Sequence, residues 1–377
     1  MTVNCFRVHC FYIFPPKVIK ASSPLQVSRI EVILAKEAML YTPLADNKVR
    51  CNLCGRRCTI LEGELGVCAA RKNEGGRLTS ISYARACSVS VDPIEKKPLF
   101  HYHPASQVLS VASPFCNFFC RFCDNWTISQ QRSPTQTQEM PPEAVVESAK
   151  QLNCDGISYT YTEPTTFFEW AYESAKLAQK KALFNTFVTN GYLTPEAVEV
   201  ISPYLDAATV DLKGAGDLKF YREVMHVPSV EPIYECLRAM KKQNIHIEIT
   251  NLIVPKYGDS EESLQKLAVW VKENLGEDTP MHLLRFFPSY EMSTLPQTPI
   301  KVVEKARMIV EEAGLRYVYT GNTPGNDGEN TYCPTCHELL VARYGFTITE
   351  WRLGDDMNCP RCNTKIAIKG KWHRLRG

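Results

Sequence analysis

The amino-acid sequence predicts an α/β protein, a partial (β/α)6 barrel with a cysteine-rich segment before it and another after it. Three observations support this prediction. Short β-rich runs alternate with amphipathic helical stretches from about residue 107 onward, which is the pattern of a parallel sheet with crossover helices. The 377 residues suffice for one large domain with small additions. The 16 cysteines fall mostly into three clusters, two of them outside the alternating region.

The alternation places each element of the barrel. Strands are expected at 107–113, 156–161, 184–189, 207–212, 245–254 and 281–287, with 317–320 as a seventh. Helices are expected at 142–152, 166–180, 195–202, 260–274 and 300–313, several of them with proline at the start. A closed eightfold barrel needs more units, so we expect an open one. The predicted parts are a leader (1–37), a cysteine-rich segment (38–104), the barrel (105–325) and a C-terminal ribbon with a basic tail (326–377).

Composition excludes several classes of protein. With 43 Lys+Arg against 41 Asp+Glu, 22% charged and 44% hydrophobic residues, a disordered, collagen-like or strongly nucleic-acid-seeking chain is disfavoured. No apolar run approaches the roughly 20 residues of a membrane-spanning helix, and no secretory signal is recognisable. We therefore expect a cytoplasmic protein without a membrane partner. The leader, residues 1–37, is interpreted as a misplaced translation start or a disordered arm.

The last cysteine cluster comprises two Cys-x-x-Cys knuckles separated by 22 residues, Cys333/Cys336 and Cys359/Cys362. Two such knuckles supply four thiolates to one tetrahedral ion, which can stabilise a segment too short to build its own core. The spacing predicts a zinc ribbon, with a rubredoxin-type iron centre as the alternative. The basic residues of 363–377 are interpreted as a solvated end, with RNA contact as the alternative.

The middle cluster reads Cys116-Asn-Phe-Phe-Cys120-Arg-Phe-Cys123. A cubane iron–sulfur cluster takes four ligands, so three thiolates leave one iron open. An open metal position is how a protein reserves a place for substrate. The alternative is a zinc knuckle that takes a fourth ligand from elsewhere. The aromatic residues Phe122 and Trp126 flank this loop, and we expect them to shield the cluster and border a bound adenine.

This Cys-x3-Cys-x-aromatic-Cys motif resembles the signature of radical S-adenosylmethionine (radical SAM) enzymes. The resemblance implies a 4Fe-4S cluster whose open iron binds the amino and carboxylate groups of S-adenosylmethionine. It implies reductive cleavage of that molecule to methionine and a 5′-deoxyadenosyl radical, which abstracts hydrogen from a substrate. It also implies the partial barrel, because radical SAM enzymes use this fold.

Polar residues follow successive predicted strands, where the loops of a β/α barrel form the active site. These positions resemble the pyruvate formate-lyase activating enzyme branch, which implies that Glu163, Asn190, Asp211 and Lys213 bind S-adenosylmethionine. That branch has two glycines where this chain has Tyr161 and Thr162, so the Thr162 hydroxyl or Glu163 is expected to replace a backbone contact. His282 and Arg285, in the sixth strand, are expected to face the substrate.

A narrower resemblance, to the radical SAM enzyme of the AmmeMemoRadiSam system, spans about residues 37–369. It is seen in the segments 92–100, 159–164, 188–192 and 319–322 and in the terminal ribbon. This resemblance implies Memo-like and AMMECR-like partners, and it names no substrate.

The first cluster is Cys51-x2-Cys54-x3-Cys58-x9-Cys68, with Arg50, Arg56 and Arg57 interspersed. Four thiolates suit either zinc or an auxiliary iron–sulfur cluster that passes electrons toward the barrel, and spacing does not separate the two.

The residues and the resemblances together predict an oxygen-sensitive radical SAM enzyme that takes electrons from a low-potential donor such as flavodoxin or ferredoxin. Its substrate is expected to be a glycine of a partner protein, as in glycyl-radical-enzyme activation. The alternatives are radical modification of a peptide, an RNA or a small molecule, and, in another class, an inactive zinc-ribbon binding protein.

Overall fold

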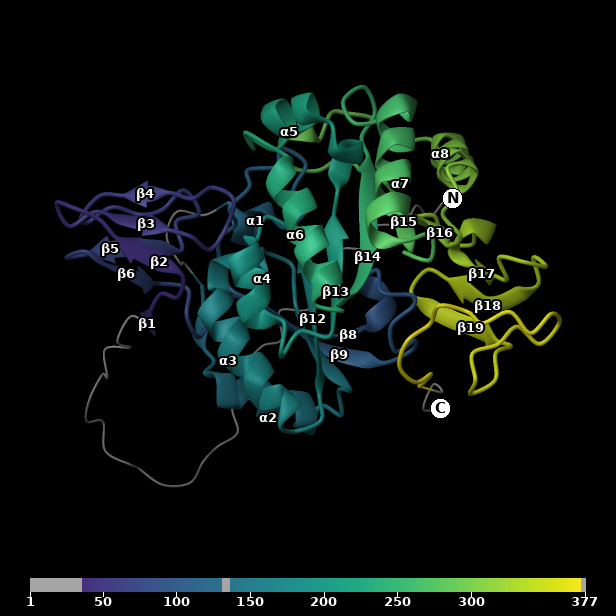
Figure 1. The fold of residues 1–377 in the computed structure, drawn as a ribbon, viewed down its shortest axis with the longest axis horizontal. Helices are drawn as coiled ribbons and strands as arrows, with labels where there is room; N and C mark the ends of the chain where they lie inside the picture. The colour runs from purple at the N-terminus through teal and green to yellow at the C-terminus, as the bar shows by residue number, and fades with distance from the viewer. Residues whose placement is uncertain (1–35, 131–135, 374–377) are drawn as a thin grey trace, which may run out of the picture. The chain divides into compact units, whose positions relative to one another are not determined.

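A computed structural model describes residues 36–130 and 136–373 of the chain. At its centre is an eight-stranded sheet with the strand order β16-β15-β14-β13-β12-β11-β9-β8 (Figure 1). The strands are β8 (Ser88–Pro93), β9 (Gln107–Ala112), β11 (Gly156–Tyr159), β12 (Phe184–Thr189), β13 (Ala207–Asp211), β14 (His246–Ile253), β15 (Met281–Arg285) and β16 (Val318–Gly321). All neighbours from β9 to β16 pair in parallel, and β8 is antiparallel to β9. The predicted parallel sheet is confirmed, its seventh strand included.

Helices connect the parallel strands as crossover units. They are α1 (Trp126–Ser129), α2 (Pro142–Gln151), α3 (Phe168–Gln179), α4 (Pro195–Ile201), α5 (Leu218–Val224), α6 (Glu231–Lys242), α7 (Glu261–Leu275) and α8 (Ile300–Glu312). Short 3-10 turns are η1 (Ile94–Lys96), η2 (Pro164–Phe167), η3 (Lys213–Gly216), η4 (Tyr290–Met292) and η5 (Asp327–Glu329). Figure 1 shows α3, α4, α6 and α7 along one face of the sheet.

Local signals explain where these helices begin and end. Thr194, Asp217 and Ser260 cap α4, α5 and α7 by accepting hydrogen bonds from backbone N–H groups of the first turn. Helix α7 ends at Leu275, and the next residue, Gly276, caps it with a φ of 104° that suits glycine. Helices α5 and α6 are absent from the sequence prediction, although buried Ile233, Cys236, Leu237 and Met240 have helical spacing in α6.

Strand alternation divides the side chains of the sheet between two faces. In β14, Ile247 and Ile249 belong to the main hydrophobic core, and this strand contacts α6. Glu248, between them, is buried on the opposite face and accepts hydrogen bonds from the backbone of Phe100 and His101. The segment that includes η1 thus packs against the face of the sheet turned away from the helices.

Residues 36–86 form small antiparallel sheets beside the barrel. One contains β1 (Lys36–Glu37), β6 (Arg77–Ser80) and β5 (Arg71–Glu74), and another contains β2 (Tyr41–Pro43), β3 (Val49–Cys51) and β4 (Thr59–Ile60). The strand β7 (Arg85–Ala86) pairs with β10 (Gln138–Glu139). The predicted leader, 1–37, lies outside the described residues except for its last two, which form β1.

The C-terminal segment is a three-stranded antiparallel sheet of β17 (Thr331–Tyr332), β18 (Leu339–Tyr344) and β19 (Thr347–Trp351). It shares a hydrophobic cluster with Phe100, Tyr317 and Tyr319, at the beginning of β16. The guanidinium of Arg343 lies 4.2 Å from the centre of the Phe100 ring. The segment therefore packs at the amino ends of the parallel strands, and Figure 1 shows it on the side of the sheet opposite β1–β6.

Among the described residues, no helix is both long enough and apolar enough to cross a membrane.

Candidate active site and the three cysteine groups

The loop that leaves β9 carries Cys116, Cys120 and Cys123 at the carboxyl edge of the parallel sheet. All three thiols are free and partly buried, and burial raises the pKa of each. The backbone N–H of Phe118 donates to the Cys116 sulfur at 3.4 Å, and the Ser129 hydroxyl lies 3.2 Å from the Cys123 sulfur. Hydrogen-bond donors near the sulfurs stabilise their thiolate form.

Glu163 joins the loops that follow β11 and β12. Its carboxylate accepts hydrogen bonds from the N–H and hydroxyl of Thr165, from the Thr189 hydroxyl at 2.7 Å and from the Asn190 N–H at 2.8 Å. Burial raises the pKa of this carboxyl group, whose residue is 2% exposed. Four donors from the chain thus hold Glu163 in place beside the cysteine loop.

Asn190 connects this network to the cysteines. Its amide nitrogen donates to the Asn117 side-chain oxygen at 2.7 Å and lies 3.9 Å from the Cys116 sulfur. The sequence prediction missed Asn117, Thr165 and Thr189. Asn117 could have been found as the polar residue inside the cysteine motif. Its own amide nitrogen is buried without a hydrogen-bond partner among the described residues.

Asp211 and Lys213 lie at the end of β13 and form an ion pair at 2.9 Å. The Thr250 hydroxyl on β14 also donates to Asp211. Burial alone would lower the pKa of Lys213, but Asp211 raises it above its usual value, so the ammonium stays protonated. This positive charge lowers the pKa of Cys120 and Cys123 against the opposing effect of burial.

The three other residues predicted to contact a cofactor lie in different surroundings. Phe122 is 6% exposed and stacks on Phe220 of α5, with ring centres 5.8 Å apart. The Thr162 hydroxyl donates to the Ser113 carbonyl at 2.6 Å. Trp126 is 43% exposed and stacks on Tyr290 at 5.0 Å. Of these three, Trp126 is the residue that presents an accessible aromatic face.

The structure separates His282 from Arg285, which were expected to face one substrate together. Residues three apart in a strand point to opposite faces. His282, near the amino end of β15, is 2.7 Å from Glu248 and stacks on Tyr319. Arg285, at the carboxyl end, donates to the Thr298 carbonyl at 2.6 Å. The joint placement was therefore wrong, because it ignored strand alternation.

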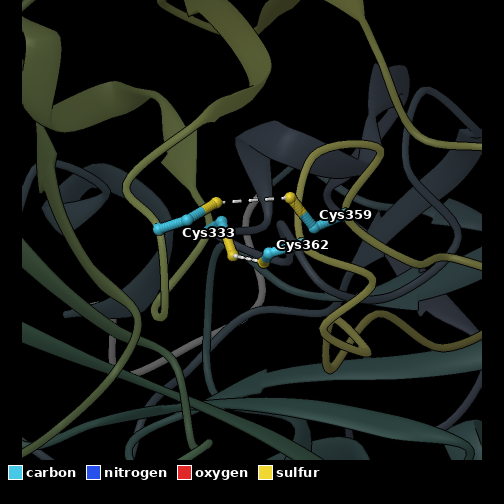
Figure 2. Close-up of side chains that lie close together, drawn as sticks. Cys333, Cys359 and Cys362 are labelled. Atoms are coloured by element: carbon cyan, nitrogen blue, oxygen red, sulfur yellow. Dashed lines mark hydrogen bonds between the residues drawn. The ribbon is translucent and has the colours of Figure 1, made fainter.

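The C-terminal cysteine group, Cys333, Cys336, Cys359 and Cys362, has the geometry of a site for one ion. Cys333 and Cys362 have sulfurs 3.5 Å apart, and Cys336 and Cys359 have sulfurs 3.6 Å apart. Figure 2 shows Cys333, Cys359 and Cys362 converging on one point. Four thiolates around an ion at about 2.3 Å would be about 3.8 Å from one another. Within 36–130 and 136–373, no other group of three or more potential metal ligands has all its ligand atoms within 4.8 Å.

The N-terminal cysteine group, Cys51, Cys54, Cys58 and Cys68, lines one pocket. Arg71 shares this pocket, and its guanidinium lies 3.7 Å from the Cys51 sulfur. Every cysteine of the described residues is free.

Comparisons with known proteins agree with this site. The family model described as the radical SAM superfamily matches residues 110–271, which include the cysteine loop, Glu163, Asn190, Asp211 and Lys213. The chain is 46% identical over 335 residues to an uncharacterized protein of Methanocaldococcus jannaschii, a match that covers 88% of this chain and 99% of the relative.

Two solved structures show weaker likenesses. A radical SAM methyltransferase from Sphaerobacter thermophilus is 14% identical over 60% of this chain and 70% of its own, with a TM-score of 0.46. A domain of pyruvate-formate lyase-activating enzyme from Bacteroides vulgatus is 16% identical over 44% of this chain and 99% of its own, with a TM-score of 0.39. The family match shows that residues 110–271 form a radical SAM superfamily domain. This domain contains the three-cysteine loop after β9 and the polar ends of the next strands.

Proposed function

We propose that this protein is an enzyme that reductively cleaves S-adenosylmethionine at a 4Fe-4S cluster bound by Cys116, Cys120 and Cys123. The observation that carries the proposal is the convergence of these three thiols with polar residues of three further strand ends. When bound, the cluster supplies one electron and an open iron position, and the resulting 5′-deoxyadenosyl radical abstracts hydrogen from the substrate. Membership of the superfamily supports this chemistry.

The chain's own residues have distinct roles in this proposal. The three thiolates would bind three irons of the cluster, which would leave the fourth iron for the amino and carboxylate groups of S-adenosylmethionine. Lys213 offsets the negative charge of the thiolates and is itself oriented by Asp211. Asn190 is proposed to bind the methionine portion, a role supported by its amide nitrogen, which lies 3.9 Å from the Cys116 sulfur. Glu163 acts as a positioning residue, since its carboxylate already accepts four hydrogen bonds.

The C-terminal cysteine group is proposed to hold structural zinc. All four of its ligand atoms lie within 4.8 Å of one another, and two Cys-x-x-Cys turns complete a closed tetrahedral site. A closed site offers no open position for a substrate. The segment packs at the amino ends of the strands, away from the cysteine loop, which favours a structural role.

For the substrate, we favour a glycine of a partner protein over a peptide, an RNA or a small molecule, by analogy with the activating enzymes. A partner that gains a persistent organic radical only in the presence of this protein and S-adenosylmethionine would support that choice. A stable mass change in a peptide or an RNA would instead identify that molecule as the substrate. The Memo-like and AMMECR-like proteins are the first partners to test.

The central experiment is an anaerobic assay of 5′-deoxyadenosine after reconstitution with iron and sulfide and reduction by dithionite. Wild type and Cys87→Ala, which removes a lone cysteine outside the three groups, should form product. The C116A/C120A/C123A variant should form none. Equal product from that variant would refute the cluster assignment. Wild-type protein that takes up no iron would favour the alternative function, an inactive zinc-ribbon binding protein.

A further inference from the structure

We propose that the N-terminal cysteine group binds a second 4Fe-4S cluster, which delivers electrons to the cluster of the cysteine loop. All four cysteines line one pocket, and two arginines, Arg56 and Arg71, line it with them. No acidic residue is among the lining residues, and the carboxylate nearest to them, Glu169, is paired with Arg71. The surroundings thus suit an anionic group with four thiolate ligands.

The spacing of the sulfurs separates a cluster from a single ion. In the C-terminal cysteine group the ligand atoms all lie within 4.8 Å of one another. Among the residues that the structure describes, no three sulfurs of the N-terminal group meet this condition, and those of Cys116, Cys120 and Cys123 do not meet it either. In a cubane each thiolate binds a different iron, so its ligands are farther apart than those of one ion. Neither the N-terminal group nor the cysteine loop therefore has the one-ion spacing of the C-terminal group.

The N-terminal group is also fixed against the active-site loops. The Arg56 guanidinium donates to the Asn117 carbonyl at 2.9 and 3.1 Å, next to Cys116. Cys54 forms a β-bridge with Leu193, three residues after Asn190. The following Gly55 donates from its N–H to the Tyr192 carbonyl at 2.8 Å.

The turn that carries Cys54 docks closely on the barrel. A Cβ atom at Gly55 would lie 2.6 Å from Pro232, so only glycine permits this approach. Asn117, Thr165 and Thr166, which flank the catalytic site, line the same pocket as the four cysteines. The two metal-binding groups thus share a wall formed by the active-site loops.

The electron path follows from this arrangement and rests on the proposed function. A reduced one-electron donor of the ferredoxin or flavodoxin class is oxidised by one electron and reduces the N-terminal cluster from the 2+ to the 1+ state. That cluster returns to 2+ when it passes the electron to the cluster of the cysteine loop. No proton or bond is exchanged in either step.

The test of the site uses the C116A/C120A/C123A variant, whose remaining iron reports the N-terminal group alone. After anaerobic reconstitution we expect about four irons and four sulfides per chain, with an EPR signal after reduction. We also expect about one zinc per chain from the C-terminal group. Adding C51A/C54A, which leaves only two of the four cysteines, should remove the iron and leave the zinc, whereas adding Cys87→Ala should change neither. About two zincs with no iron, or no metal beyond the C-terminal zinc, would overturn the proposal while leaving 5′-deoxyadenosine formation by the wild type intact.

The test of the electron path compares two reductants of the cysteine-loop cluster. In C51A/C54A, which keeps only two of the four cysteines, reduction by flavodoxin should slow at least tenfold relative to reduction by photoreduced deazaflavin, a small molecule that needs no relay. Cys87→Ala should keep the wild-type ratio of the two rates. An unchanged ratio in C51A/C54A would refute the relay. Zinc content and circular dichroism check that each variant is folded.

Discussion

The buried ion pair between Arg71 and Glu169 should hold the N-terminal segment to the barrel. The side chains are 2% and 1% exposed, and the pair joins β5 to α3. Arg71 also donates to the Met39 carbonyl at 2.9 Å, while the Met39 N–H donates to Glu169 at 2.7 Å. Glu169→Gln keeps the shape of the side chain and removes the carboxylate that pairs with the buried guanidinium.

The expected loss of stability in Glu169→Gln follows from the burial of this ion pair. Two unit charges about 4 Å apart at an effective dielectric constant of about 20 attract by about 4 kcal/mol. Removing one partner of a buried pair typically costs 3–5 kcal/mol, because the other charge stays desolvated. We therefore expect Glu169→Gln to lower the free energy of unfolding by about 3–5 kcal/mol.

Urea unfolding of anaerobically reconstituted protein, followed by tryptophan fluorescence, measures this change. Trp170 is fully buried next to Glu169 and reports on the region. Glu196→Gln is the matched control, since Arg57–Glu196 joins the same segment to α4 but is 36% and 53% exposed. We expect the control to cost less than about 1 kcal/mol. A loss below 1 kcal/mol in Glu169→Gln would show that this pair does not hold the segment to the barrel, as would an R71M/E169M variant that is less stable than Glu169→Gln.

Three further predictions concern the barrel. Burial raises the pKa of Glu95 to about 7, above its unfolded value, so its contribution to stability is present below about pH 4 and is lost as pH rises through 7. The stability of wild type should thus fall by up to about 3 kcal/mol across that window, and Glu95→Gln should remove this part of the pH dependence in urea titrations. Lys213→Met should lower the midpoint potential of the cysteine-loop cluster in an EPR-monitored redox titration, because a nearby positive charge favours reduction of the cluster. The control Lys219→Met, at an exposed lysine, should leave the potential unchanged. Equal potentials in Lys213→Met and wild type would contradict an electrostatic role for Lys213. Gly191→Ala should lower the melting temperature and weaken binding of S-adenosylmethionine. The φ of Gly191 is 69°, and a Cβ atom there would lie 2.6 Å from Val210. Unchanged binding of S-adenosylmethionine in calorimetry would contradict this prediction.

The barrel was predictable because its signals are local. Strand β12 is found at the residues expected, 184–189, since a buried strand between breakers carries its own pattern. The expected helix at 166–180 begins later, at Phe168, because Pro164 starts a 3-10 turn first. The small strands of residues 36–86 were not predicted, since two- to four-residue strands leave no periodicity to detect.

The site was predicted only in part, because side-chain direction depends on tertiary contacts. Asp211, Lys213 and Asn190 converge on the cysteine loop, as expected for residues at the carboxyl ends of parallel strands. Phe122 lies in the core because α5, which the prediction lacked, places Phe220 against it. His282 is hydrogen-bonded to Glu248, which lies 34 residues earlier in the chain, so no local sequence pattern predicts the contact.

The most direct test of the central claim is EPR spectroscopy of the reduced protein with and without S-adenosylmethionine. If Cys116, Cys120 and Cys123 leave one iron open, addition of S-adenosylmethionine should change the spectrum of the wild type and of Cys87→Ala. The spectrum of C116A/C120A/C123A, which reports the N-terminal group alone, should not change. A reduced wild-type cluster whose signal is unaffected by saturating S-adenosylmethionine would contradict the account.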